Sequence, residues 1–202
     1  MKHEAWADEA ARIADISLSP QQMDQLARYA DLLTRIAVPR GMISSSDANR
    51  LWERHILDGL RGAAELANAS SVVDVGSGAG VPGVPLTVAL PSARFVLLEP
   101  RTARAAFLEA VADALSLANV AIVRKRVEEA AGLFDAGVAR AFASPFETWT
   151  ALQHLLRPGG RVIYWAGQSF DGSVLAQAGV PFRLSTHSDL ARTGPLVIMG
   201  PQ

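Results

Sequence analysis

The chain has 202 residues, a formal net charge of −1 and 50% hydrophobic residues. This length suits one globular domain, or one domain with a small appendage, and the apolar content excludes wholesale disorder. Because the sequence contains no cysteine, disulfides, thiolate metal sites, iron–sulfur clusters and cysteine nucleophiles are excluded.

The charge balance gives no overall attraction to nucleic acid or to anionic lipid, so a polyanionic partner would need a local basic patch. The basic residues are 17 Arg and 2 Lys, and the densest run is Arg124-Lys125-Arg126. No stretch reaches the apolar length of a membrane-spanning helix, and residues 1–9 lack a signal-type apolar core. We therefore expect a soluble cytoplasmic protein without a membrane partner. A monomer is our expectation for the oligomeric state, on which these features do not bear.

The first third of the chain predicts helices. Ser19, Pro20 and Gln22 match the N-cap, first and third positions of a helix. Apolar residues then recur at helical spacing. A second cap cluster predicts another helix that opens at Ser46 or Asp47.

That second helix carries Arg50, Arg54, His55 and Asp58. Their spacing predicts ion pairs between the arginines and Asp58 on one helix face. His55 and Asp58 stand one turn apart, which predicts a hydrogen bond that docks the helix on the main domain. Two such residues do not make a metal site, and we expect no metal.

From residue 71 the hydrophobic period changes from helix to alternating strand and helix. Strands are predicted at 72–75, 94–99, 120–123, 135–140, 161–165, 180–186 and 195–199, and helices at 102–117 and 145–156. This alternation predicts an α/β fold with a doubly wound, mostly parallel sheet and a reversed edge strand. Residues 1–68 would form an N-terminal helical cap, and residues 69–202 the ligand-binding domain.

A glycine-rich loop follows the first predicted strand. Asp74, Gly76, Gly78 and Gly80 alternate with other residues, and Gly83 completes a G-x-G-x-x-G spacing. Such loops bind a nucleotide cofactor close to the main chain, and the acid at the end of the next strand, here Glu99, would hold the ribose.

The same spacing allows a dinucleotide or S-adenosylmethionine. Three features favour S-adenosylmethionine. The glycines stand at every second residue behind Asp74, and not at the looser dinucleotide spacing alone. The acidic Asp74 would suit its cationic amino group but repel a pyrophosphate, and a reversed strand at 195–199 is typical of methyltransferases. A nicotinamide-dependent oxidoreductase remains an alternative, as does a binding protein without activity.

Several segments together resemble the glucose-inhibited division protein B family. These are residues 50–58, the loop 74–85, Leu97-Leu98-Glu99-Pro100, Arg126-Val127-Glu128-Glu129 and Arg140-Ala141-Phe142-Ala143-Ser144. The resemblance implies a class I methyltransferase with a Rossmann-like fold. It implies transfer of a methyl group from S-adenosylmethionine to N7 of a guanine in 16S (small-subunit) ribosomal RNA, as free RNA or in a particle.

The resemblance also implies roles for individual residues. Gly76, Gly78, Gly80 and Val81 would line the S-adenosylmethionine site, with Asp74 beside them and Glu99 at the ribose. Val127 and Glu128 would lie beside the adenine. Arg140 would lie where the cofactor meets the target guanine and is the catalytic candidate. Two segments depart from the family pattern, Gly41-Met42-Ile43 in place of Asn-Leu-Thr and Ala166 in place of a Lys.

The residues also suit N7 chemistry. Guanine N7 has a free lone pair, so its methylation needs orientation rather than a general base. The fourth predicted strand ends in Arg140-Ala141-Phe142 instead of the Asn/Asp-Pro-Pro-aromatic motif typical of exocyclic-amine methyltransferases. Arg140 could bind guanine O6, a phosphate or the cofactor carboxylate, or form a partly buried ion pair. A small molecule or a protein remains an alternative methyl acceptor.

Overall fold

A computed structural model describes residues 2–185 and 193–201 of the chain. Seven strands form one sheet in the order β3-β2-β1-β4-β5-β7-β6. Their bounds are β1 (Ser71–Val75), β2 (Arg94–Leu98), β3 (Val120–Val123), β4 (Phe134–Arg140), β5 (Leu156–Trp165), β6 (Phe182–Leu184) and β7 (Leu196–Met199).

The five strands from β3 to β5 run parallel, and β7 pairs antiparallel with both β5 and β6. Every residue of β1 is buried, because helices cover both faces of a doubly wound sheet. The predicted α/β fold with a reversed edge strand is confirmed. The strand predicted at 180–186 is shorter, and residue 186 lies outside the described residues.

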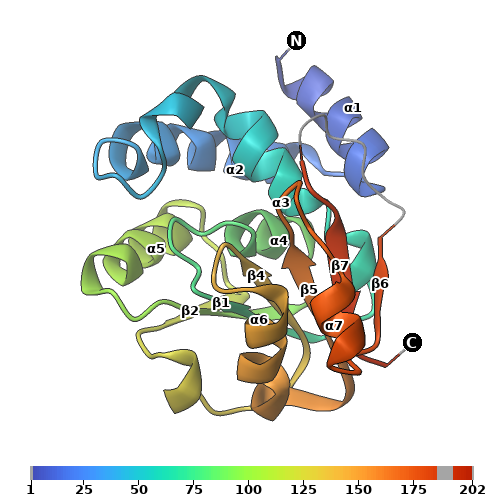
Figure 1. The fold of residues 1–202 in the computed structure, drawn as a ribbon. Coiled ribbons are helices and arrows are strands. Elements are labelled where there is room, and N and C mark those ends of the chain that lie inside the picture. The colour runs from blue at the N-terminus through green and yellow to red at the C-terminus, as the bar shows by residue number, and fades with distance from the viewer. Residues whose placement is uncertain (1, 186–192, 202) are drawn as a thin grey trace.

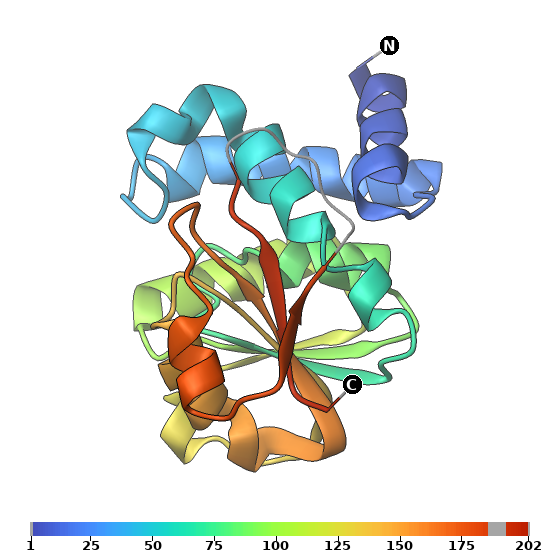
Figure 2. The same ribbon diagram turned by 45° about the vertical axis from the view of Figure 1, so that its right-hand side comes forward.

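Helices α4 (Gly83–Ala89) and α5 (Thr102–Ala114) cover one face of the sheet, and α6 (Pro145–Leu152) and α7 (Ser173–Gln177) cover the other (Figures 1 and 2). Side chains of β1 alternate between the two faces. Val72 belongs to the apolar cluster under α4 and α5, whereas Val73 and Val75 belong to the opposite cluster. Helix α7 was not predicted, because its five residues are too few to show a hydrophobic period.

The N-terminal helices stack over α4 and α5 (Figure 2). They comprise α1 (Lys2–Ala14), α2 (Pro20–Leu32), the π-helical η1 (Leu33–Ala37) and η3 (Trp52–Leu57), the 3₁₀-helical η2 (Ser45–Arg50) and η4 (Ala64–Leu66), and α3 (Asp58–Leu60). Their apolar side chains join the cluster on that face of the sheet. The division at residue 68 stays a prediction; it falls between η4 and β1.

Helix α2 begins as the sequence predicts. The Ser19 hydroxyl accepts from the Gln22 backbone N–H over 3.3 Å, and the Gln22 side chain accepts from the Ser19 N–H over 2.8 Å. The next helix was predicted to open at Ser46 or Asp47, and this was wrong by two or three residues. Its N-cap is Ser44, whose hydroxyl accepts from Ser46 N–H.

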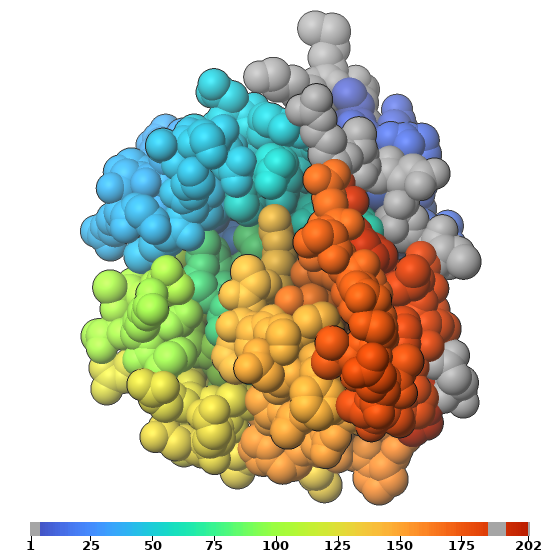
Figure 3. Space-filling model, viewed as in Figure 1, coloured from blue at the N-terminus to red at the C-terminus, as the bar shows by residue number. Residues whose placement is uncertain are grey.

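Short 3₁₀ segments complete the chain: η5 (Val127–Glu129) follows β3, and η6 (Gln153–Leu155) precedes β5. The carboxyl ends of β1, β2 and β4 meet at one edge of the sheet, under the N-terminal helices. Figure 3 shows the face where these segments meet, hollowed between the cyan helices and the green and gold segments. In open α/β sheets this edge is where ligands bind.

Candidate functional site

The glycine loop follows β1 and is bonded to the end of β2. The backbone N–H groups of Gly76 and Ser77 donate to the Leu98 carbonyl over 3.0 and 3.1 Å. Gly78 has a φ of +58°, and a Cβ there would meet no atom closer than 3.7 Å. Gly78 therefore allows the turn, and no atom crowds its Cα, as a close-approach position requires.

Gly80 faces the protein instead. A Cβ on it would come within 2.7 Å of Val84 and 3.0 Å of the Tyr29 hydroxyl. That hydroxyl is buried and donates to the Ala79 carbonyl over 2.7 Å, so α2 fastens the loop. Gly80 is therefore needed for the packing of the loop against Val84 and Tyr29. It does not border the cavity beside the loop.

Asp74 lies beneath the loop and is 1% exposed. One carboxylate oxygen accepts from the Gly83 N–H over 3.1 Å, and the other has no hydrogen-bond partner within the described residues. Burial raises the pKa of Asp74 to about 7, and the nearby charge of Glu99 adds to the rise. This position supports the loop, and a direct contact of Asp74 with a ligand stays a prediction.

Glu99 stands at the end of β2 beside the loop, as predicted. Its two carboxylate oxygens accept from the backbone N–H groups of Gly78, over 3.0 Å, and Arg101, over 2.9 Å. Glu99 is 2% exposed, so its carboxylate is fixed next to Gly78. Its contact with a ribose stays a prediction.

Val127 and Glu128 lie in η5, directly after β3. Val127 is buried in the apolar cluster on the α6 face, and Glu128 is exposed. Neither residue borders the cavity beside the glycine loop, and neither does Glu99. Their roles at an adenine or ribose therefore stay predictions.

Two cavities open at the carboxyl edge of the sheet. The first, of about 330 Å³, lies against the glycine loop and is lined by Met42, Ile43, Ser44, His55, Gly76, Ser77, Gly78, Ala79, Val81, Arg104, Arg140 and Ala141. It thus brings together four predicted site residues: Gly76, Gly78, Val81 and Arg140.

The second cavity, of about 480 Å³, lies between η3 and the ends of β4 and β5. Its lining includes Arg50, Arg54, Asp58, Arg140, Ala141, Tyr164, Trp165, Ala166 and Gln168. Arg140 and Ala141 line both cavities. A group in one cavity would therefore approach a group in the other at the end of β4.

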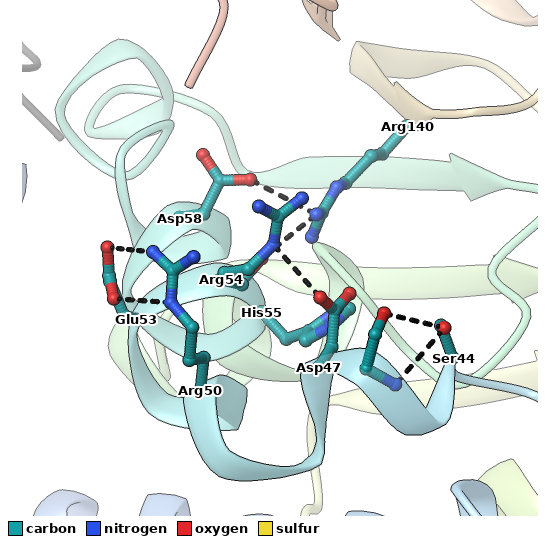
Figure 4. Close-up of polar contacts among 9 residues, drawn as sticks. Ser44, Asp47, Arg50, Glu53, Arg54, His55, Asp58 and Arg140 are labelled. Atoms are coloured by element: carbon teal, nitrogen blue, oxygen red, sulfur yellow. Dashed lines mark hydrogen bonds and ion pairs between the residues drawn. The ribbon is translucent and has the colours of Figure 1, made fainter. Parts of the chain in front are cut away.

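Arg140 is the last residue of β4 and points toward η3 and α3 (Figure 4). Its Nη2 donates to the Arg54 carbonyl over 2.9 Å and lies 3.4 Å from an Asp58 carboxylate oxygen. Its Nη1 is buried and has no acceptor among the described residues. The partly buried ion pair that the sequence allowed for Arg140 is thus present, and one donor remains.

The partners predicted within the second helix were wrong. His55 contacts Asp47 over 3.2 Å rather than Asp58, and Arg54 also faces Asp47, over 3.3 Å (Figure 4). Arg50 instead pairs with Glu53 over 2.7 Å. The cause is the local backbone: 3₁₀ and π turns replace a continuous α-helix, so the i to i+4 geometry does not hold.

Burial lowers the pKa of His55, and the charge of Arg140 lowers it further. The lowered pKa favours the neutral form of His55. Within residues 5–185 and 193–201, no three His, Asp or Glu side chains gather as a metal site would require. The same residues contain no helix with the length and apolar character needed to cross a membrane.

Several lining residues were missed from the sequence. Ile43 and Ser44 line the first cavity, and Tyr164 and Gln168 line the second. Ile43 lies between two helices and Tyr164 within an apolar strand, so neither carried a chemical signal. Only the fold brings them to the carboxyl edge.

Comparison with solved structures agrees with this architecture. A SAM-dependent methyltransferase from Aquifex aeolicus superposes with a TM-score of 0.58 and 17% identity, covering 80% of this chain and 97% of that one. A ribosomal protein L11 methylase from Lactobacillus delbrueckii subsp. bulgaricus gives 0.55 and 19%, covering 70% and 76%. At these identities the likeness shows the class I methyltransferase fold alone.

Sequence relatives are closer. "Ribosomal RNA small subunit methyltransferase G" of Mycobacterium leprae (strain TN) is 42% identical over 146 residues, which are 70% of this chain and 59% of that protein. The protein of the same name from Salinispora arenicola (strain CNS-205) is 39% identical over 178 residues, 83% of this chain and 73% of that protein. The chain thus matches about three fifths of the Mycobacterium leprae relative's length.

A family model described as "rRNA small subunit methyltransferase G" matches residues 22–181. This range includes every segment on which the resemblance was based, and it gives no support to the nicotinamide alternative. The chain therefore belongs to the GidB family of rRNA small subunit methyltransferases.

Proposed function

We propose that this protein transfers a methyl group from S-adenosylmethionine to N7 of a guanine in 16S ribosomal RNA. The observation that supports this most is the double role of Arg140, which lines both the cavity of the glycine loop and the second cavity. A methyl donor in the first cavity and a base in the second would meet there. Since the substrate is ribosomal, the reaction would take place in the cytoplasm.

The residues of the first cavity fit the cofactor. A Cβ at Gly78 would meet no atom closer than 3.7 Å, and Gly76, Gly78 and Val81 border the cavity. We propose that the backbone of the loop contacts the cofactor and that Glu99 binds its ribose. Val127 and Glu128 would contact its adenine. Asp74 would contribute indirectly, because its carboxylate accepts a hydrogen bond from the Gly83 N–H and so supports the loop.

When bound, S-adenosylmethionine supplies an electrophilic methyl group, which bonds to N7 while the electron pair of the broken bond stays on sulfur. No proton leaves N7, so the chain needs no general base. Its task is to hold and orient the acceptor. Arg54, Arg140 and Tyr164 line the second cavity and are the residues that would hold the acceptor.

Guanine O6 lies beside N7 and accepts hydrogen bonds. Arg140 lines the second cavity, and a donor of its guanidinium would suit O6, whereas adenine presents an amino group at that place. We therefore assign Arg140 to recognition of the O6 and N7 edge of the guanine. The backbone carbonyl of Arg54 would keep the guanidinium in place meanwhile.

Two measurements test the function. Calorimetry should show binding of S-adenosylhomocysteine and none of NADH. Labelled S-adenosylmethionine should transfer its methyl group to small-subunit RNA from a strain that lacks this gene, and not to the RNA of the complemented strain. NADH binding without binding of S-adenosylhomocysteine, or label in protein alone, would contradict the proposal.

A further inference from the structure

Asp58 is a buried acid at the contact between the N-terminal helices and the sheet. It begins α3 and is 5% exposed. Its backbone carbonyl accepts from the Trp165 indole N–H over 2.7 Å, which ties α3 to the end of β5. A buried carboxylate is costly unless charged donors satisfy it.

The two carboxylate oxygens of Asp58 have different partners. Oδ1 accepts from Arg61 Nη1 over 2.7 Å, and Arg61 Nη2 donates in turn to the Gly194 carbonyl over 3.0 Å. Oδ2 faces Nη2 of Arg140 at 3.4 Å. Arg61 therefore fixes the carboxylate from one side, and the other side is directed at Arg140 (Figure 4).

This arrangement restricts a long side chain at the junction of the two cavities. Arg140 has several rotatable bonds, and its guanidinium is useful to a ligand only in one orientation. Asp58 and the Arg54 carbonyl both hold Nη2, which leaves Nη1 as the donor without a partner among the described residues. Both holding groups come from the N-terminal helical part of the chain.

We propose that Asp58 is a positioning residue for methyl transfer, which acts only through Arg140. It sets the Arg140 guanidinium at the junction of the two cavities in the orientation that would meet the acceptor base. The N-terminal helices thereby complete the acceptor site and are not only a cover for the sheet. This inference rests on the proposed function, because it concerns the same second cavity.

A double-mutant cycle tests this role. Asp58→Asn keeps an oxygen for Arg61 but places an amide donor against the Nη2 donor of Arg140. We expect kcat for RNA methylation to fall about tenfold or more, with the affinity for S-adenosylhomocysteine nearly unchanged. In an Arg140→Met background the same change should leave kcat unaltered.

The matched control is Asp31→Asn, which removes an exposed Asp–Arg pair on α2 and η1 and should change neither quantity. An equal loss of kcat from Asp58→Asn in both backgrounds would overturn the inference and leave Asp58 a structural residue. All rates should be measured well below each variant's melting temperature, because Arg61 is buried beside Asp58.

A second measurement separates this inference from the proposed function. NMR relaxation of the Arg140 Nε–H group reports the mobility of its side chain without any substrate. We expect the Arg140 side chain to be more mobile in Asp58→Asn than in the wild type. In Asp31→Asn its mobility should equal that of the wild type. An Arg140 that stays as rigid as in the wild type would refute the positioning role, whereas a wild-type chain that methylates no RNA would refute the function alone.

Discussion

At the scale of single residues, the glycines of the loop serve two different purposes. Gly78 borders the first cavity, and a Cβ on it would meet no atom closer than 3.7 Å. Gly80 would clash with Val84 and Tyr29 if it carried a Cβ. A substitution at Gly78 therefore tests whether the loop binds the cofactor. A substitution at Gly80 tests how the loop packs against Val84 and Tyr29.

Gly78→Asp should lower the affinity for S-adenosylhomocysteine at least about tenfold, a cost of about 1.4 kcal/mol. The new carboxylate would enter the cavity beside the buried Glu99, and like charges repel. Calorimetry measures the affinity. The control is Gly159→Asp. Gly159 also has a positive φ, +82°, so the substitution causes similar backbone strain, but a Cβ there would have no neighbour within 4 Å. Equal affinities of both variants and wild type would show that the loop is not the cofactor site.

Asp74→Asn should change how stability depends on pH. Burial raises the pKa of Asp74 to about 7, so between its unfolded pKa near 4 and about 7 the folded state binds a proton that the unfolded state releases. The stability from Asp74 is thus complete below pH 4 and is lost as pH rises to about 7.

The variant lacks this titration and keeps an oxygen for the Gly83 N–H. Its free energy of unfolding, relative to wild type, should rise with pH over that range by up to about 1.4 kcal/mol per pH unit. Urea titrations at pH 4.5, 5.5 and 6.5 measure this difference. A difference that stays constant with pH would contradict the raised pKa.

The position of a residue at the end of a strand could be predicted from the sequence. The position of a side chain that depends on long-range contacts could not. Glu99 follows an apolar strand after a glycine loop, so its place at the end of that strand could be predicted, whereas its bond with the Gly78 N–H could not. The bond from Arg140 to the Arg54 carbonyl joins residues 86 positions apart. No local pattern encodes such a contact, because it depends on how the N-terminal helices dock.

At the scale of elements, α2 links the N-terminal helices to the loop. Gln22 donates to the carbonyls of Val88 and Ala89 at the end of α4, and Tyr29 donates to the Ala79 carbonyl. The helix therefore holds both ends of the loop–helix unit that follows β1.

Tyr29→Phe should lower the free energy of unfolding by about 1 kcal/mol, the loss of one buried hydrogen bond. It should also weaken the binding of S-adenosylhomocysteine roughly threefold, or about 0.7 kcal/mol, because the loop loses its support at Ala79. Ser19→Ala is the control, since it removes the N-cap of the same helix at a similar cost without touching the loop. If both variants bind the cofactor alike, α2 does not order the loop.

The elements themselves could largely be predicted, since buried parallel strands and a capping box leave clear local patterns. The capping box at Ser19 and the strand Val120–Val123 agree with the structure residue by residue. The 3₁₀ and π turns between Ser45 and Leu57 could not be predicted, because they share the composition of an α-helix. That difference also changed the partners of Arg50, Arg54 and His55.

At the scale of the whole molecule, a net charge of −1 means that an RNA substrate must be bound by local basic groups. The parallel register places Leu98 beside Val123, so Arg101 and the run Arg124-Lys125-Arg126 lie together at the carboxyl edge. All four are exposed. By contrast, Arg28 and Arg35 are neutralised by Asp24 and Asp31 on the same helical segment.

The triple variant Arg124→Gln, Lys125→Gln, Arg126→Gln should weaken binding of small-subunit RNA at least about tenfold at low salt. A plot of log Kd against log salt should become shallower by about 0.7 for each phosphate that the variant no longer neutralises. The control is Arg28→Gln with Arg35→Gln, which should leave the slope unchanged. A triple variant with the slope of the wild type would place the RNA elsewhere on the molecule.

The most direct test of methyl transfer to guanine N7 is chemical cleavage of the product. Small-subunit RNA from a strain that lacks this gene is incubated with the protein and S-adenosylmethionine, treated with borohydride and aniline, and mapped by primer extension. We expect strand cleavage at a single guanine, absent without the cofactor and absent with Gly78→Asp. Methyl groups incorporated into the RNA without any aniline cleavage would contradict modification at N7.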